Sequence, residues 1–389
     1  MLKLLAKIFV KETSDMSPIE VRRRYGVLCG AYGIFLNVLL SIAKLSVGTI
    51  CGSIAITADA INNVSDATSS AVTLLGFRLA GRKPDADHPF GHGRFEYVSG
   101  LIVAMVIVVM GIELMISSVK KIISPEPVEC SVAALIILAL SILVKFYMML
   151  YNRSVGKRFS SAALKATAAD SLSDCVATSV VLICMCIAYF TDLSLDAYAG
   201  ALVSLFILYT GIGAAKEIIS QILGNPPDPE LVKKIEALVM ENEFIVGIHD
   251  MIVHDYGPGN IMVSLHAEVP REGDIMELHD AIDNVEFRIR RELGCQAVLH
   301  MDPIVTEDKL VLDTRAALAE KILELSPEAT IHDFRMVPGP THSNLIFDVV
   351  APFSLKLSED EIRERVNQLV KELNPSFNAV IEIDRPFVS

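Results

Sequence analysis

The chain has 389 residues, 52% of them hydrophobic, and a mean hydropathy of +0.47, which is high for a soluble protein. Residues 1–220 carry 19 basic and 16 acidic side chains, whereas residues 221–389 carry 15 basic and 31 acidic ones. Such a composition excludes a disordered chain, a collagen-like chain and a nucleic-acid-binding protein with a basic domain. The seven scattered Cys include no CxxC pair, which argues against a disulfide scaffold or a thiolate zinc site.

Apolar runs of membrane-spanning length fill the first part of the chain. They predict six transmembrane helices, near residues 25–50, 54–79, 97–118, 130–151, 163–190 and 195–219. The N-terminus has no cleavable signal pattern, and Met1–Val10 is typical of an amphipathic arm lying on the membrane surface. The chain is therefore expected to be a multi-pass protein of the cell membrane, and its compact loops favour a bacterial inner membrane.

Basic residues predict the orientation of these helices, because cytoplasmic loops are enriched in Lys and Arg. One side of the membrane receives thirteen of them: Lys3, Lys7, Lys11, Arg22, Arg23, Arg24, Arg78, Arg82, Lys83, Arg94, Arg153, Lys157 and Arg158. The opposite side receives only Lys120 and Lys121. Both termini are therefore expected in the cytoplasm. The predicted regions are an arm (1–24), a transport domain (25–222), a cytoplasmic domain (223–305) and a further cytoplasmic segment (306–389).

Two of the predicted helices carry acidic residues near mid-membrane depth, where charge is costly and usually functional. The candidate ligands are Asn62 and Asp66 in the second helix, and Asp170 and Asp174 in the fifth. Each pair has i, i+4 spacing and so lies on one helical face. Three carboxylates and an amide oxygen suit a hard divalent cation. Asp59, near the start of the second helix, either extends this set or caps the helix.

A structural polar network between the helices is the alternative explanation. Three acids without a basic partner repel one another unless they are protonated or bound to a cation, which favours the cation site. Lys44 and Lys145, in other helices, are potential ion-pair partners and keep the structural alternative open.

These features, together with the loop sequence HPFGHGRFE at residues 88–96, resemble the cation diffusion facilitator family over about residues 20–303. The resemblance implies a homodimeric exporter of divalent metals driven by proton antiport, and not an enzyme. Many zinc members place His or Asp at the position of Asn62 and His at that of Asp170. The Asn-Asp-Asp-Asp set here resembles the set found in the manganese branch of the family. A site without imidazole ligands has a greater relative preference for Mn²⁺, which prefers oxygen ligands.

The resemblance also implies a second metal site in the loop after the second helix, at Asp85, His88 and His92. The alternative for this loop is a purely structural role, with its conformation held by caps and by turns at Gly91 and Gly93. Residues 226–303 have a predicted αββαβ order that fits the ferredoxin-like cytoplasmic domain of the family, giving the fold class of a six-helix membrane domain followed by an α+β domain.

Five residues of this domain match the family's cytoplasmic metal-binding positions: His249, His266, His279, His300 and Asp302. Such a set suits zinc-like coordination, and solvated surface histidines are the alternative. Nitrogen ligands in this domain and oxygen ligands in the membrane favour different metals. Either this domain binds another metal, or its ligands are only partly used, or the manganese assignment is wrong.

Residues 310–389 repeat the αββαβ pattern and predict a duplicated ferredoxin-like unit. SPEATIHDFRMVPGPTHSNLIFDVVAP parallels EFIVGIHDMIVHDYGPGNIMVSLHAEVP. The alignment matches His249 with His332 and Asp302 with Asp384, and it replaces two histidines: His266 by Val350 and His300 by Glu382. Because most nitrogen ligands are lost, this copy is expected to pack or regulate and not to coordinate metal.

The sequence thus predicts a Mn²⁺ efflux transporter that exchanges metal for protons, works as a homodimer in the lipid bilayer, has no prosthetic group and binds no nucleic acid. Zn²⁺ is a further candidate ligand. The alternatives are a zinc, iron or cadmium exporter of the same family, and a membrane metal sensor without transport. A membrane enzyme finds little support, because the chain has no GxxxxGK[ST], GxSxG or HExxH motif.

Overall fold

The computed structural model describes residues 18–51, 54–124, 132–191 and 196–386. The expected surface arm at Met1–Val10 lies outside the described residues. The chain divides after Asn225 into two compact units, except that residues 256–259 group with the first unit.

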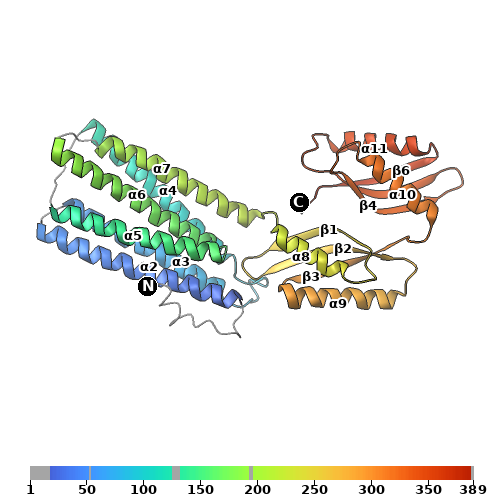
Figure 1. Ribbon diagram of the computed structural model, residues 1–389, viewed down its shortest axis with the longest axis horizontal. Coiled ribbons are helices and arrows are strands. Elements are labelled where there is room, and N and C mark those ends of the chain that lie inside the picture. The colour runs from blue at the N-terminus through green and yellow to red at the C-terminus, as the bar shows by residue number, and fades with distance from the viewer. Residues whose placement is uncertain (1–17, 52–53, 125–131, 192–195, 387–389) are drawn as a thin grey trace. The chain divides into compact units, whose positions relative to one another are not determined.

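The first unit consists of long helices that run side by side (Figure 1). Its described helices are α2 (Pro18–Cys51), α3 (Ile54–Ala80), α4 (Phe95–Ile123), α5 (Val132–Arg158), α6 (Ala162–Thr191) and α7 (Asp196–Leu223). Within the described residues, five helices, α2 and α4 to α7, are long and apolar enough to cross a membrane. The helix α3 is not one of them, because it carries many polar residues in the sequence INNVSDATSS.

The first helix begins at Pro18 and not near residue 25, so the end of the predicted arm is helical. Glu20 forms i, i+3 and i, i+4 ion pairs with Arg23 and Arg24, and such pairs extend a helix beyond its apolar part. Arg22 anchors this turn, because its guanidinium donates to Glu96 of α4 at 2.8 Å. Ser161 donates to the same Glu96 carboxylate, so one buried acid joins α2, α4 and the turn before α6.

The helix bundle exposes large apolar side chains and buries polar ones, as expected where lipid replaces water on the outside. Exposed examples include Phe35, Leu143 and Leu202. Small residues allow α3 and α6 to pack closely in the interior. The hydroxyl oxygens of Thr73 and Thr167 lie 2.9 Å apart across these two helices. This packing places the acidic faces of α3 and α6 next to each other.

The second unit contains two αββαβ subdomains. The first subdomain comprises α8 (Pro229–Met240), β1 (Gly247–Asp255), β2 (Ile261–Pro270), α9 (Ile275–Leu293) and β3 (Gln296–Ile304). This element order agrees with the αββαβ order that the sequence predicted for residues 226–303. The sheet has the order β1-β2-β3, with β1 antiparallel and β3 parallel to β2. Apolar residues of α8 and α9 pack on one face of this sheet.

The second subdomain comprises α10 (Lys309–Ile322), β4 (Thr330–Pro338), β5 (Ser343–Val350), α11 (Glu359–Leu373) and β6 (Phe377–Asp384). Its sheet order, β4-β5-β6, and the senses of pairing are the same as in the first subdomain. Side chains of α10 and α11 form its core with one face of the sheet.

Strand register corrects one equivalence that the sequence alignment suggested. His249 pairs with His266 across β1 and β2, and His332 pairs with Asp348 across β4 and β5. The structural counterpart of His266 is therefore Asp348, and Val350 was the wrong match. The β4–β5 connection is one residue shorter than its counterpart, so an ungapped alignment anchored on the IHD motif is out of register by one residue at β5, and the match to Val350 was out by two.

Candidate metal centres

The predicted carboxylates of the membrane unit meet in the interior of the bundle. Asp66 of α3 and Asp170 and Asp174 of α6 each offer an oxygen, and these atoms lie within 4.8 Å of one another. We call these three residues the membrane cluster. All three are buried. Asn62 lies one helical turn before Asp66 and is partly buried. The structure describes α3 as already helical from Ile54, so Asp59 lies inside the helix and does not cap it; its side chain lies outside the described residues.

A lysine completes this arrangement. The ammonium Nζ of Lys145 on α5 lies 2.6 Å from Asp66 Oδ2 and 2.6 Å from Asp174 Oδ2. Lys145 is itself buried, so the pairing is well shielded from solvent. The ammonium supplies the positive charge that three adjacent carboxylates require in a medium of low dielectric constant. The sequence identified Lys145 as a potential ion-pair partner of these acids, and in the structure it bridges Asp66 and Asp174.

The three residues predicted in the loop between α3 and α4 also come together. Asp85 Oδ1 lies 3.4 Å from His88 Nδ1, and Asp85 Oδ2 lies 3.3 Å from His92 Nε2. The backbone N–H of His88 donates to Asp85 at 2.8 Å and lowers the pKa of this carboxyl. His92 is buried, and its Nδ1 has no hydrogen-bond partner in the described part of the chain. The loop therefore offers two ring nitrogens and a carboxylate to a cation.

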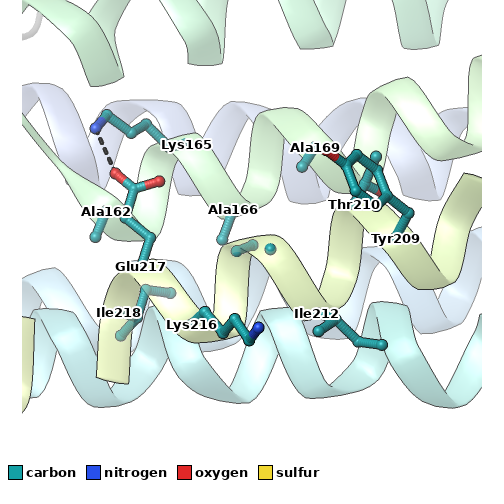
Figure 2. A pocket seen from close by; sticks show the side chains of 12 residues that line it. Ala162, Lys165, Ala166, Ala169, Tyr209, Thr210, Ile212, Lys216, Glu217 and Ile218 are labelled. Carbon is teal, nitrogen blue, oxygen red and sulfur yellow. Dashed lines mark hydrogen bonds and ion pairs between the residues drawn. The ribbon is translucent and has the colours of Figure 1, made fainter. Parts of the chain in front are cut away.

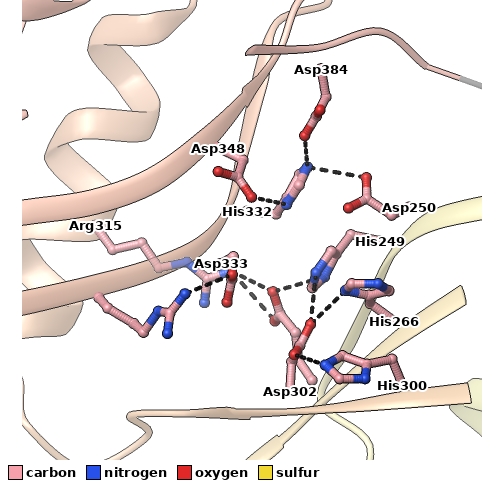
Figure 3. Close-up of polar contacts among 12 residues, drawn as sticks. His249, Asp250, His266, His300, Asp302, Arg315, His332, Asp333, Asp348 and Asp384 are labelled. Carbon is pink, nitrogen blue, oxygen red and sulfur yellow. Dashed lines mark hydrogen bonds and ion pairs between the residues drawn. The ribbon is translucent and has the colours of Figure 1, made fainter. Parts of the chain in front are cut away.

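The first subdomain gathers four of its five predicted ligands on the sheet face opposite the core formed with α8 and α9 (Figure 3). His249, His266 and Asp302 offer ligand atoms within 4.8 Å of one another. We call them, with His300, the histidine cluster. Asp302 is its centre, because Oδ2 lies 3.1 Å from His249 Nε2 and 2.8 Å from His266 Nδ1, and Oδ1 lies 3.2 Å from His300 Nε2.

Strand register explains the histidine cluster: His249, His266 and His300 are neighbours across β1, β2 and β3. Burial lowers the pKa of His249, which favours the neutral ring that ligates metals. The remaining predicted ligand, His279, lies apart from this group. It is an exposed residue of α9, and its recorded ion-pair partner is Asp283, at 3.5 Å.

A further group lies beside the histidine cluster and was not predicted as a site. His332 of β4 is surrounded by Asp250 of β1, Asp348 of β5 and Asp384 of β6 (Figure 3). Its ring stacks on that of His249, with 4.5 Å between ring centroids. The repeated IHD motif was the sequence signal that pointed to this position. Its companions were missed because the alignment placed Val350, and not Asp348, opposite His266.

The membrane unit also has a groove of about 510 Å³ between α6 and α7. Figure 2 shows the pair that spans it, in which Lys165 donates to Glu217 at 2.7 Å. The residues that line this groove do not include the membrane cluster. The groove is therefore a separate feature of the helix surface.

Comparison with known families agrees with the two-part architecture. Residues 31–223 match the cation efflux transmembrane domain, and residues 227–304 match the cytoplasmic domain of cation efflux proteins. The chain belongs to the cation diffusion facilitator family. A member of this family is a divalent cation efflux transporter, so the membrane cluster lies in a domain built for cation transport. The second match ends at residue 304, before α10.

The relatives differ in the cargo that their names give. An uncharacterized transporter of Methanocaldococcus jannaschii is 31% identical over 267 residues, which cover 68% of this chain and 94% of the relative. The manganese efflux system protein MneS of Bacillus subtilis is 29% identical over 269 residues, covering 68% and 91%. The cation-efflux pump FieF of Escherichia fergusonii is 26% identical over 267 residues, covering 68% and 88%.

Proposed function

We propose that this transporter exports Mn²⁺ from the cytoplasm in exchange for protons. The observation that carries the proposal is the membrane cluster, in which three carboxylates converge without a histidine. Oxygen ligands suit Mn²⁺, whereas imidazole and thiolate ligands increase the relative preference for Zn²⁺. The similarity to a relative named as a manganese efflux protein supports the same choice of cargo.

In the proposed cycle, Mn²⁺ enters from the cytoplasm and binds the oxygens of α3 and α6, with Asn62 as an additional ligand. The Lys145 ammonium neutralises the cluster when metal is absent and has to move away when a divalent cation binds. On the opposite side, protons compete for the carboxylates and release the metal. Rocking of one helix group against another changes which side has access.

The remaining architecture of the proposal follows the predicted topology. The helix α3 is the sixth span, both termini are cytoplasmic, and two chains form a homodimer through the cytoplasmic domain. The identical strand orders of the two αββαβ subdomains support their origin by duplication. Zn²⁺ or another divalent metal bound by the histidine cluster and the loop residues would regulate export.

One observation favours a second candidate function, a membrane metal sensor that does not transport. Lys145 already places a cation between Asp66 and Asp174. If this ion pair were permanent, the central site would be closed to metal while the extramembrane clusters stayed open. The sensor therefore predicts metal binding without flux, and the exporter predicts both.

The decisive experiment measures Mn²⁺ and Zn²⁺ flux side by side in proteoliposomes with an imposed proton gradient. The exporter predicts Mn²⁺ flux that depends on the gradient and is abolished by Asp66→Asn. This substitution preserves size and removes a ligand charge. Glu217→Gln is the matched control, because it removes an exposed carboxylate of the same membrane unit and should leave flux intact.

Each result separates the candidates. Zn²⁺ flux without Mn²⁺ flux would replace manganese by zinc as the cargo. Metal binding without flux of any tested metal would favour the sensor. Normal flux in Asp66→Asn would remove the membrane cluster as the transport site.

A further inference from the structure

The His332 cluster, defined as His332 with Asp250, Asp348 and Asp384, is the strongest unassigned group in the second unit. His332 is only 5% exposed. Neither of its ring nitrogens has a hydrogen-bond partner among the residues that the structure describes. A buried imidazole with two unsatisfied nitrogens is costly, so its retention requires an explanation.

The distances around the ring fit a shared cation better than hydrogen bonds. His332 Nε2 lies 3.4 Å from Asp250 Oδ1 and 3.7 Å from Asp384 Oδ2, and Nδ1 lies 3.8 Å from Asp348 Oδ2. Hydrogen bonds between such atoms are about 2.7 to 3.2 Å long. Two ligands of one ion with bonds of about 2.1 Å lie about 3 to 3.4 Å apart, close to the shorter of these spacings.

The backbone places these groups in matching positions. Asp250 and Asp333, each the residue after a paired histidine, have φ values of 50° and 54° and lie at irregularities in the β1–β2 and β4–β5 pairings. A β-bulge redirects a side chain, and the Asp250 carboxylate reaches His332 of the other subdomain (Figure 3). The first subdomain therefore contacts the site through Asp250, beside the ligand group of His332, Asp348 and Asp384.

Strand register shows how the ligand set changes between the subdomains. The positions of His249, His266 and His300 in the first subdomain correspond to His332, Asp348 and Glu382 in the second. Two imidazoles are thus replaced by carboxylates, and Asp302 corresponds to Asp384. The second subdomain has lost nitrogen ligands but has gained oxygen ligands at the same places.

Among the residues that the structure describes, these carboxylates form no ion pair with Lys or Arg. Within the described ranges, the recorded ion pairs of Asp250, Asp348 and Asp384 are those with His332. A single imidazolium would leave a net charge of −2 on three ionised carboxylates, whereas a divalent cation bound by a neutral His332 would leave only −1.

We propose that the His332 cluster binds a hard divalent cation, such as Mn²⁺, through one ring nitrogen of His332 and the carboxylates of Asp348 and Asp384, whose ligand atoms lie within 4.8 Å of one another. This site is additional to the histidine cluster and differs from it in preferring oxygen-seeking metals. The proposal does not depend on which metal is transported.

The test uses the full chain in detergent with Asp174→Asn, His88→Ala and His266→Ala, which disable the other clusters and transport together. Mn²⁺ binding is measured by the loss of the free-ion electron paramagnetic resonance signal. This background should still bind Mn²⁺, and adding Asp348→Asn with Asp384→Asn should weaken the affinity by more than about tenfold. These two replacements keep side-chain size, so folding is preserved, and an unchanged melting temperature verifies this.

The control is His342→Ala, which removes an exposed histidine of the same subdomain and should not change binding. In a second variant, Asp348→His restores the first subdomain's ligand type and should shift preference toward Zn²⁺. A background that binds no Mn²⁺, or an affinity that survives Asp348→Asn with Asp384→Asn, would overturn the proposal and leave a His332–carboxylate ion pair only.

Discussion

The membrane cluster and the histidine cluster each gather at least three ligand groups, but their charges are balanced in different ways. In the membrane, the Lys145 ammonium bridges Asp66 and Asp174. In the first αββαβ subdomain, one carboxylate, Asp302, is surrounded by three imidazoles, and the group is partly open to solvent. Where water is excluded, several carboxylates need a strong internal counter-charge, whereas neutral imidazoles beside one carboxylate do not.

The largest effect is expected from removing that counter-charge with Lys145→Met. Asp66, Asp170 and Asp174 would then lie together in the membrane without the ammonium that bridges two of them. We expect a loss of stability of about 3 to 5 kcal/mol, as for other broken buried ion pairs. Thermal melting in metal-free detergent would detect it, and saturating Mn²⁺ should recover most of the loss because it replaces the missing charge.

The matched control for Lys145→Met is Lys165→Met, which breaks an exposed pair with Glu217 and should change stability by less than about 1 kcal/mol. Equal melting temperatures for Lys145→Met and the unmodified chain would show that the bridging ammonium is not the counter-charge.

The double substitution Asn62→His with Asp170→His makes the membrane cluster resemble the histidine cluster. Imidazole ligands favour Zn²⁺ relative to Mn²⁺. The ratio of Zn²⁺ to Mn²⁺ flux in proteoliposomes should rise by about tenfold or more. An unchanged ratio would place selectivity outside these two positions.

In the histidine cluster, His266→Ala should weaken Zn²⁺ binding by about tenfold or more, since it removes a ligand beside Asp302. His279→Ala provides the comparison, because His279 lies on α9 and outside the group. Calorimetric titration of the full chain should show the larger loss for His266→Ala. A larger loss for His279→Ala would mean that the site recruits a ligand that the single chain keeps apart.

The smallest effect is expected away from all ligands. Ser358 caps α11 and forms a capping box with Glu361. Ser358→Ala should cost about 1 kcal/mol of local stability. Hydrogen exchange at the start of α11 should become faster while metal binding stays constant. Altered metal binding would show that the stability of α11 affects the ligands of the His332 cluster.

Periodicity and charge were sufficient to predict the helices and the αββαβ order. Amphipathic repeats and Asp caps mark α8 and α9, which stand where the predicted order places its two helices. The start of α2 was missed because Arg22 to Arg24 have no apolar period, and an ion pair from Arg22 to Glu96 is needed to hold that turn. The i, i+4 spacing also predicted that Asp170 and Asp174 share a face.

Sequence alone determined which residues carry ligand chemistry, because residue type and local spacing are properties of one segment. Only the tertiary structure decided which of them meet: that Lys145 of α5 bridges α3 and α6, that His279 stays apart, and that His332 faces Asp250 of the other subdomain. Such contacts depend on strand register and helix packing between segments distant in the chain, and it is the register of β4 and β5 that places Asp348, and not Val350, opposite His332.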